Sequence, residues 1–436
     1  MLNQLQDHIN SKLSYLKSSK LLIAISGGID SVVLTHLCHK MGLNIALAHC
    51  NFNLRGKESD ADEDFVLQLA EDLELEVFIE SFETKSFAED KNLSVQMAAR
   101  ELRYHWFSEL SEQLNFDYIL TAHHADDNLE TFFINLSRGT GLDGLLGIPV
   151  LNKNIARPLL NFSRDDIENY AKEQKLEWRE DSSNSSTKYL RNKLRHDVIP
   201  ILKEINPQLL QNFSKTQVHL YDSKCIIDDK ISDVFDSVIT PIDDFTFSLN
   251  IKEIKKLSHA KAYMYELLKD FGFSEWEDVF NLLDAQSGKY IQTNSHRLIK
   301  DRDFLLLSEI NSDSSESINS SETDKIVETP FGTLFIDEVD AVLESQKTII
   351  YVDKNLLKFP LTIRKWEQGD VFYPLGMAGK KKVSKYFKDK KFSLLDKENT
   401  WLLCSDEAIV WVINNRADNR FRVTDNTKTI LKIEIK

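Results

Sequence analysis

A short glycine-rich loop holds the residue types best suited to chemistry in this chain. It reads Ser26-Gly27-Gly28-Ile29-Asp30-Ser31, follows the apolar run 21–25 and precedes the helix-like run 32–41. Two glycines allow a tight turn and a close approach of the backbone to a ligand. A helix that begins at the end of the loop offers free N–H groups and the positive end of its dipole to an anion. The pattern therefore predicts a phosphate-binding loop between a strand and a helix.

Asp30 is the unusual member of this loop, because a carboxylate alone would repel a phosphate. A bridging Mg²⁺ ion resolves the conflict, since it prefers carboxylate and phosphate oxygens as ligands. The spacing matches neither the Walker A loop nor the G-x-G-x-x-G loop. A plain strand–helix turn with a capping residue is the structural alternative. We favour the phosphate loop because the strand, the helix and the full S-G-G-x-D-S pattern occur together.

Two acidic residues further along the chain share a helix face. Asp127 and Glu130 are three positions apart in a predicted helix, 126–137, whereas Asp126 points about 100° away. Two adjacent carboxylates could hold a cationic substrate. The alternative, which the spacing alone favours, is a stabilising interaction with the helix dipole, worth ~0.3–1 kcal/mol for each acid.

The elements that must position these residues alternate between strands and helices. Such alternation predicts an α/β fold with a parallel sheet and right-handed crossovers. The strand candidates are 21–26, 44–49, 76–81 and 118–122, and the helix candidates are 31–41, 60–73, 94–114 and 126–137. His123 and His124 follow the fourth strand, where open α/β sheets bind ligands, so structural and nucleotide-contacting roles are both open.

The rest of the chain predicts further domains. A helical stretch at 208–234 leads into a small α+β segment at 240–308, and a Ser-rich acidic stretch at 311–324 is typical of a linker. Apolar strand candidates at 361–364, 402–404 and 409–413 indicate a β-rich end. We therefore predict a catalytic domain at 1–205, a helical linker and middle domain at 206–310, a linker at 311–325 and a C-terminal domain at 326–436.

Basic side chains gather in two segments although the formal net charge is −15. Segment 188–203 has five basic residues against one acid, and segment 376–391 has seven lysines against one. Tyr386 and Phe387 lie within the second segment, which favours RNA binding. A solvated surface is the alternative for both.

The loop resembles the signature of the N-type ATP pyrophosphatases, and further segments resemble one member family, the tRNA(Ile)-lysidine synthetases. Val371 departs from the arginine expected there, and Phe392-Ser393 departs from Ile-Pro. The matching segments are His49–Arg55, Gln96–Tyr104, Thr121–Thr131, Ser137–Gly141, Arg157–Leu160, Asp181–Asn184 with Tyr189, Arg191-Asn192, Arg195-His196, Gly288–Tyr290, Lys300–Arg302 and Arg364–Lys391.

The resemblance implies a Rossmann-like fold of the adenine nucleotide alpha hydrolase type and a C–N bond-forming ligase. In this family, ATP adenylates O2 of the wobble cytidine of a tRNA(Ile) with anticodon CAU and releases pyrophosphate. The ε-amine of L-lysine then attacks C2 and AMP leaves. The product, lysidine, changes codon reading from AUG to AUA and tRNA identity from Met to Ile.

The resemblance also implies a role for each matching residue. Asp30, Asp127, Glu130 and Arg138 are expected to be catalytic, and Asp127 with Glu130 to bind lysine. The residues expected to bind ATP are Ser26, Gly27, Gly28, Ile29, Asp30, Ser31, His49 and Arg100, with Mg²⁺ at Asp30. An ion pair with a nearby acid is equally open for Arg100. The residues expected to bind tRNA are Arg191, Asn192, Arg195, Lys380, Lys381, Lys382 and Lys385.

Other classes are less favoured. A small-molecule ligase similar to NAD synthetase would release pyrophosphate without RNA and would not need 326–436. A non-catalytic RNA-binding protein would not need Asp30, Asp127 and Glu130. The four scattered cysteines have no zinc spacing, and we find no membrane or targeting segment, so we expect a cytoplasmic protein. A homodimer through 208–234 is left open.

Overall fold

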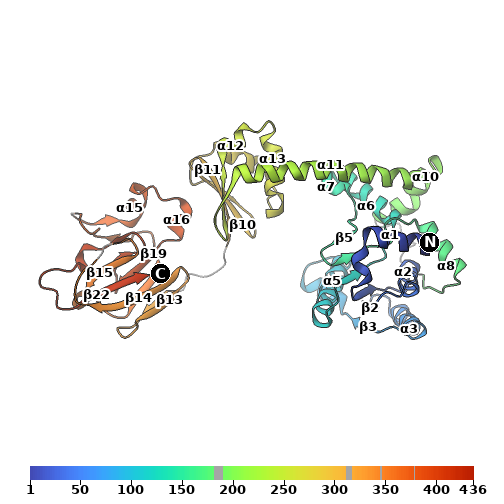
Figure 1. The fold of residues 1–436 in the computed structure, drawn as a ribbon, viewed down its shortest axis with the longest axis horizontal. Coiled ribbons are helices and arrows are strands. Elements are labelled where there is room, and N and C mark those ends of the chain that lie inside the picture. Colours follow the sequence, from blue (N-terminus) through green and yellow to red (C-terminus); the bar gives the residue numbers. More distant parts are fainter. Residues whose placement is uncertain (181–189, 311–316, 344–345, 378) are drawn as a thin grey trace. The chain divides into compact units, whose positions relative to one another are not determined.

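The computed structural model describes residues 1–180, 190–310, 317–343, 346–377 and 379–436. The chain divides into two compact units, Met1–Asp228 and Asp229–Lys436, and the division falls within the long helix α11 (Leu209–Val238). The domain boundaries proposed at 205/206 and 310/311 remain predictions. Figure 1 shows the fold and labels the helices and strands for which there is room.

The first unit contains the predicted parallel sheet. Its strand order is β3-β2-β1-β4-β6-β5, and only β5 runs antiparallel to its neighbour. The strands are β1 (Leu21–Ala24), β2 (Ile45–Asn51), β3 (Val77–Ser81), β4 (Tyr118–Leu120), β5 (Leu151–Asn152) and β6 (Ile155–Ala156). The α/β prediction is thus confirmed.

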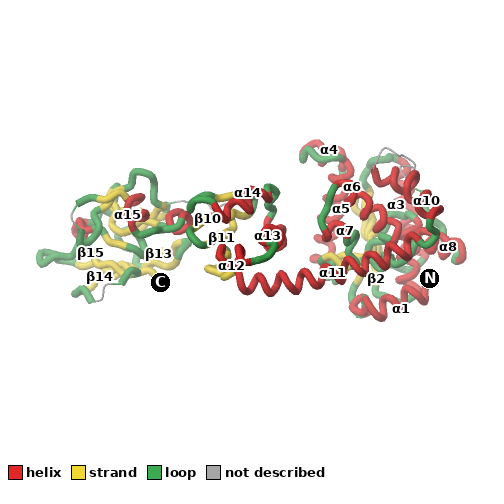
Figure 2. The backbone as a smooth tube through the Cα atoms, turned by 90° about the horizontal axis from the view of Figure 1, so that it is seen from above, coloured by secondary structure: helices red, strands yellow, loops and turns green. Residues whose placement is uncertain are grey.

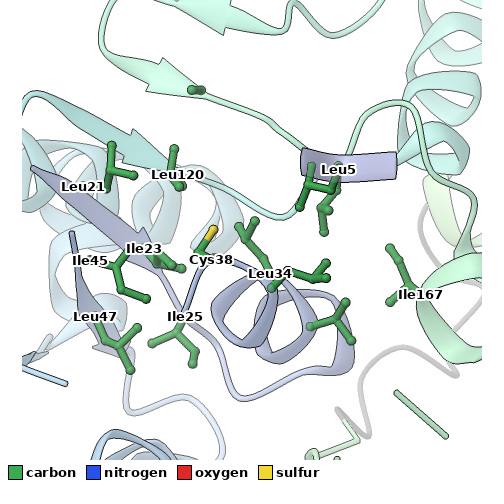
Figure 3. Close-up of a cluster of buried hydrophobic side chains, with 14 of the residues drawn as sticks. Leu5, Leu21, Ile23, Ile25, Leu34, Cys38, Ile45, Leu47, Leu120 and Ile167 are labelled. Carbon is green, nitrogen blue, oxygen red and sulfur yellow. The ribbon is translucent and has the colours of Figure 1, made fainter. Parts of the chain in front are cut away.

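Side chains alternate between the two faces of each strand, so this sheet has apolar side chains on both faces. Helices cover both of them. Leu21, Ile23 and Ile25 face a core built with α1, α2, α3 and α8, and Figure 3 shows Leu34 and Cys38 of α2 between these strand residues and Ile167 of α8. Leu22 faces a second core built with α5. The helices are α1 (Leu2–Lys12), α2 (Ile29–Lys40), α3 (Lys57–Asp72), α4 (Thr84–Asp90), α5 (Val95–Leu114), α6 (Ala125–Arg138), α7 (Leu142–Leu145), α8 (Arg164–Glu173), α9 (Leu190–Lys193) and α10 (Ile199–Ile205).

The order of the strands creates the place for a ligand. β1 and β4 are neighbours, but the chain continues from β1 to β2 on one side and from β4 to β6 on the other. A crevice forms outside the carboxyl ends of strands at such a switch point. The glycine-rich loop follows β1 and the His123-His124 pair follows β4, so the fold brings both predicted segments to this crevice.

The second unit begins with the middle segment. Its antiparallel sheet has the order β7-β8-β11-β10-β9, with helices packed on a core that includes Leu249, Leu298 and Leu305. The elements are β7 (Ile239–Asp243), β8 (Thr246–Asn250), α12 (Ile251–Lys256), α13 (Ala260–Leu268), α14 (Trp276–Asn281), β9 (Tyr290–Gln292), β10 (His296–Asp301) and β11 (Phe304–Glu309).

The C-terminal part is rich in strands, as predicted, and Figure 2 shows them in yellow. Its sheets have the orders β12-β16-β19-β20-β21, β13-β14-β22-β15 and β17-β18. The elements are β12 (Ile318–Ser320), β13 (Ile326–Thr329), β14 (Gly332–Val339), β15 (Ile349–Asp353), β16 (Leu361–Lys365), β17 (Val371–Phe372), β18 (Lys381–Lys382), α15 (Val383–Asp389), α16 (Leu394–Glu398), β19 (Trp401–Ser405), β20 (Ala408–Val412), β21 (Arg416–Ala417) and β22 (Ile430–Ile435).

One part of the predicted linker belongs to this sheet instead. Ile318–Ser320 forms β12 and pairs antiparallel with Leu361–Ile363 of β16. Ile318 packs against the C-terminal core, which explains why the one apolar side chain of the Ser-rich stretch is not exposed as in a linker. Residues 311–316 lie outside the described residues.

None of the described helices combines the length and apolar character that crossing a bilayer requires. The predicted cytoplasmic location remains a prediction.

Candidate active site

The glycine-rich loop forms the turn that its sequence predicts. Gly27 has a φ of +82°, in the left-handed region that glycine tolerates, and Gly28 is the N-cap of α2. The Ser31 hydroxyl donates to the Gly28 carbonyl oxygen (2.8 Å), and the Ser26 amide donates to the Ser31 hydroxyl oxygen (3.2 Å). These bonds close the loop and leave the first-turn amides of α2 at its mouth, where they can bind an anion.

Asp30 lies in the first turn of α2 and is paired with an arginine that sequence reasoning missed. Arg164 Nη1 donates to both carboxylate oxygens of Asp30, at 2.7 and 2.8 Å. Its Nε donates to Glu168 (2.9 Å), and its backbone amide donates to Asp126 (2.8 Å). Arg164 therefore connects the start of α8 to the nucleotide loop and to α6.

His124 joins the nucleotide loop to the acids of α6. Its imidazole is buried, with Nε2 3.8 Å from Asp30 and 3.4 Å from Asp127. Its backbone amide donates to the Asp127 carboxylate (3.1 Å). Asp30 of the loop and the acids at the start of α6 thus lie around one imidazole. The predicted phosphate loop and the predicted acidic pair therefore belong to one site.

Asp127 and Glu130 lie on one face of α6, as predicted, and together bind a guanidinium. Arg195 donates from Nε to Glu130 Oε1 (2.6 Å) and from Nη2 to Asp127 Oδ1 (2.9 Å). Arg191 Nε lies 3.3 Å from Glu130 Oε2. The Glu130 side chain is only 1% exposed, so its charge depends on these partners.

The surroundings shift the pKa values of these two acids in opposite directions. Burial raises the pKa of Glu130 above its ordinary value, although Arg195 opposes this. Burial acts to raise the pKa of Asp127 as well, but His124 and His123 hold it below its ordinary value. Of the two acids, Asp127 therefore has the stronger tendency to stay ionised.

Asp126 points elsewhere, as the helical spacing predicts. Its carboxylate accepts from Lys203 Nζ (2.5 Å) and from the backbone amide of Arg164. It therefore fastens α10 and α8 to α6 and takes no part in the Asp127–Glu130 pair.

Three residues named from sequence have contacts other than the acids around His124. Arg138 is exposed at the last position of α6, about 16 Å along the helix axis from Asp127. Arg100 lies over the Tyr104 ring (4.8 Å) on α5. His49 is buried, its Nδ1 is 3.0 Å from the Ile25 carbonyl oxygen, and burial lowers its pKa. Their expected roles remain predictions.

Two arginines of the first basic segment pair with an acid of α6 while staying partly exposed. Arg191 and Arg195, expected to contact tRNA, both contact Glu130, and Arg191 also donates to the Thr131 hydroxyl (2.7 Å). A run of positive charge fits carboxylates as well as phosphates, and here the carboxylates of α6 are near. Asn192 lies between them on α9. The matching residues Asp181–Asn184 and Tyr189 lie outside the described residues.

The second basic segment presents lysines but not aromatic rings. Lys380, Lys382 and Lys385 are exposed, whereas Lys381 pairs with Asp389 (2.7 Å). Tyr386 and Phe387, expected to favour RNA binding, are 5% and 0% exposed and belong to a core with Phe372 and Leu402. They cannot stack on bases, because α15 is amphipathic and directs them inward.

Replacing Phe387 with Ala is therefore expected to destabilise the C-terminal part by about 3–5 kcal/mol, since it removes a fully buried ring. Urea unfolding followed by circular dichroism would measure this. Lys388→Ala on the exposed side of the same helix is the control. An RNA-binding defect at unchanged stability would show instead that the ring contacts RNA.

No group of three or more His, Cys, Asp or Glu side chains within the described ranges is arranged to hold a metal ion alone. The Asp30 side chain is 30% exposed beside the first-turn amides of α2. Mg²⁺ commonly takes one or two carboxylates and completes its shell with phosphate oxygens and water. Asp30 therefore fits a metal that arrives with a nucleotide.

Family models match three stretches of the chain. A PP-loop domain matches residues 1–202, a TilS substrate binding domain matches 242–310, and a TilS substrate C-terminal domain matches 361–435. The first match contains the whole cluster around His124.

Curated relatives match nearly the full length. The tRNA(Ile)-lysidine synthase of Parabacteroides distasonis is 41% identical over 420 residues, which cover 94% of each chain. That of Bacteroides thetaiotaomicron is 38% identical and covers 98% of each chain. That of Porphyromonas gingivalis strain W83 is 35% identical, covering 98% of this chain and 96% of its own.

Proposed function

The chain belongs to the tRNA(Ile)-lysidine synthase family, and we propose on this basis that it ligates free L-lysine to the wobble cytidine of a tRNA(Ile) with a CAU anticodon. It is an ATP-dependent ligase with a PP-loop domain. The two steps are adenylation of cytidine O2 with release of pyrophosphate, and attack of the lysine ε-amine on C2 with release of AMP. One observation carries the proposal: the nucleotide loop and a cation-binding pair of carboxylates meet at His124.

The ATP step would use the loop from Ser26 to Ser31. The amides at the start of α2 suit the phosphates, and Asp30 would hold Mg²⁺ against them. Bound there, Mg²⁺ would neutralise charge that develops on the leaving pyrophosphate. Adenylation matters because an oxygen bonded to C2 leaves poorly until it is attached to phosphate.

Lysine would bind at Asp127 and Glu130. These carboxylates already bind a cation of the chain, the Arg195 guanidinium, through charge-assisted hydrogen bonds. An ammonium group of lysine would take over part of this contact. Burial raises the pKa of Glu130, so its carboxylate is a stronger base toward an ammonium group than that of an exposed glutamate.

The tRNA would also contact the C-terminal part. The exposed Lys380, Lys382 and Lys385 suit phosphate contacts, which position an RNA rather than select its sequence. Arg191, Asn192 and Arg195 remain proposed tRNA contacts, although Arg191 and Arg195 would first have to leave Glu130. A homodimer and a cytoplasmic location likewise remain proposals.

The small-molecule alternative is less supported, because the substrate-domain matches extend over 242–310 and 361–435. The requirements for pyrophosphate release distinguish a tRNA ligase from a small-molecule ligase. We expect release with ATP, Mg²⁺, lysine and a CAU-anticodon tRNA(Ile) transcript, together with incorporation of labelled lysine. Release without RNA, or with ammonia in place of lysine, would contradict the proposal.

A further inference from the structure

Arg164 is the cation nearest to the carboxylate of the nucleotide loop. Its Nη1 contacts both oxygens of Asp30, while Glu168 holds its Nε. Neither the sequence motifs nor the family resemblance gives Arg164 a role. Its contacts with Asp30, Glu168 and Asp126 place it between the loop, α8 and α6.

The Asp30–Arg164 pair is built so that it can open. The two side chains are 30% and 37% exposed, and ion pairs that retain contact with water are weak. The bond from Nε to Glu168 does not depend on Asp30. The guanidinium can therefore release the carboxylate and stay at the mouth of the loop.

A Mg²⁺ ion would compete with Arg164 for Asp30. Held by Asp30, it would take a carboxylate oxygen that Arg164 now contacts, and it would bind phosphate oxygens of the nucleotide as further ligands. The phosphates would then share one ion with the Asp30 carboxylate. The guanidinium, already hydrogen-bonded to that carboxylate, would then be close to the phosphates. Arginine binds phosphate through paired N–H donors.

We propose that Arg164 is a triphosphate-binding residue that exchanges partners, from Asp30 to the β- and γ-phosphates, when Mg²⁺ and ATP bind. This inference rests on the proposed use of Asp30 by Mg²⁺ and ATP. The guanidinium stabilises the pyrophosphate as its bond to the α-phosphate breaks. Before ATP arrives, the same side chain neutralises Asp30.

Equilibrium binding to the full-length protein tests this without catalysis. The probes are the Mg²⁺ complex of α,β-methylene-ATP, which is not cleaved between the α- and β-phosphates, and AMP, which has neither of the proposed contacts. In Arg164→Ala we expect the Kd of the analogue to rise about 10- to 30-fold and that of AMP to change less than threefold. Lys172→Ala removes a cation from the exposed side of the same helix and is the matched control.

Mg²⁺ alone gives a second readout. We expect it to raise the melting temperature of Arg164→Ala more than that of the wild type, because Asp30 has lost its competing cation. If circular dichroism shows that Arg164→Ala does not fold, Arg164→Lys replaces it, with an expected three- to tenfold rise for the analogue and none for AMP.

A purely structural role would weaken the analogue and AMP together, and that result would overturn the proposal, as would unchanged affinity for the analogue. Binding needs neither tRNA nor lysine. A failure of the lysidine assay would therefore be distinguishable from a failure of this inference.

Discussion

Replacing Asp127 with Asn is expected to reduce lysine incorporation about 10- to 100-fold, while tRNA-dependent pyrophosphate release continues. The variant loses the Asp127 carboxylate, the acid of the pair with the lowered pKa, which would bind the lysine ammonium. A charge-assisted hydrogen bond of this kind is worth about 1.5–3 kcal/mol. Glu130→Gln is expected to have a similar effect, with a loss of stability in addition, because it leaves Arg191 and Arg195 without their buried partner. Parallel assays of labelled lysine and pyrophosphate measure the two steps separately.

Asp126→Asn is the matched control, since Asp126 is an acid of the same helix turn with other partners. Its single amide oxygen can accept from Lys203 or from the Arg164 amide but not from both, so a small loss of stability is expected, while the KM for lysine should stay within about threefold. Equal loss of both steps in Asp127→Asn would contradict a lysine-binding role. So would a lysine KM that responds as strongly to Asp126→Asn.

The sequence predicts the sheet and its helices well because local and global signals agree in this region. Three of the four predicted strands, 21–26, 44–49 and 118–122, centre on short apolar runs, and the loop after β1 has glycine where a positive φ is needed. α8 was missed although its start has a readable signal: Ser163 and Asp166 form a capping box. Polar residues surround its buried positions Ile167 and Tyr170, so its apolar face is not obvious from the sequence.

The sequence predicted the acids of the site and its glycine-rich loop, but not which basic side chains pair with the acids. The i, i+3 spacing of Asp127 and Glu130 follows from helix geometry. The basic residues Arg164, Arg195 and Lys203 lie 38 or more positions from the acids that they contact and are brought to them by tertiary folding. The charges of neighbouring residues in the sequence cannot show whether an arginine binds a phosphate group or pairs with Glu130. The sequence does contain a signal that Tyr386 and Phe387 are buried and do not stack on RNA. Together with Val383 they have the i, i+3, i+4 spacing of a buried helix face.

Changing Lys380, Lys382 and Lys385 together to Glu is expected to weaken tRNA binding about 100-fold near 0.15 M salt. Each exposed lysine at a phosphate releases counterions, so the slope of log K against log salt should become shallower by about 2–3. Lys381 is left in place, because it pairs with Asp389 and packs over the Tyr386 ring. Fluorescence anisotropy of labelled tRNA across a salt series measures both quantities.

The control makes the same charge change on other exposed lysines of the C-terminal part, Lys325, Lys347 and Lys428. Electrostatic repulsion from net charge alone would weaken binding equally in both triple variants, whereas phosphate contacts at β18 and α15 would weaken it only in the first. Because these lysines lie outside the PP-loop domain, the affinity for ATP should not change. A triple variant that binds tRNA normally would show that the exposed lysines are a solvated surface, and that the tRNA is held elsewhere.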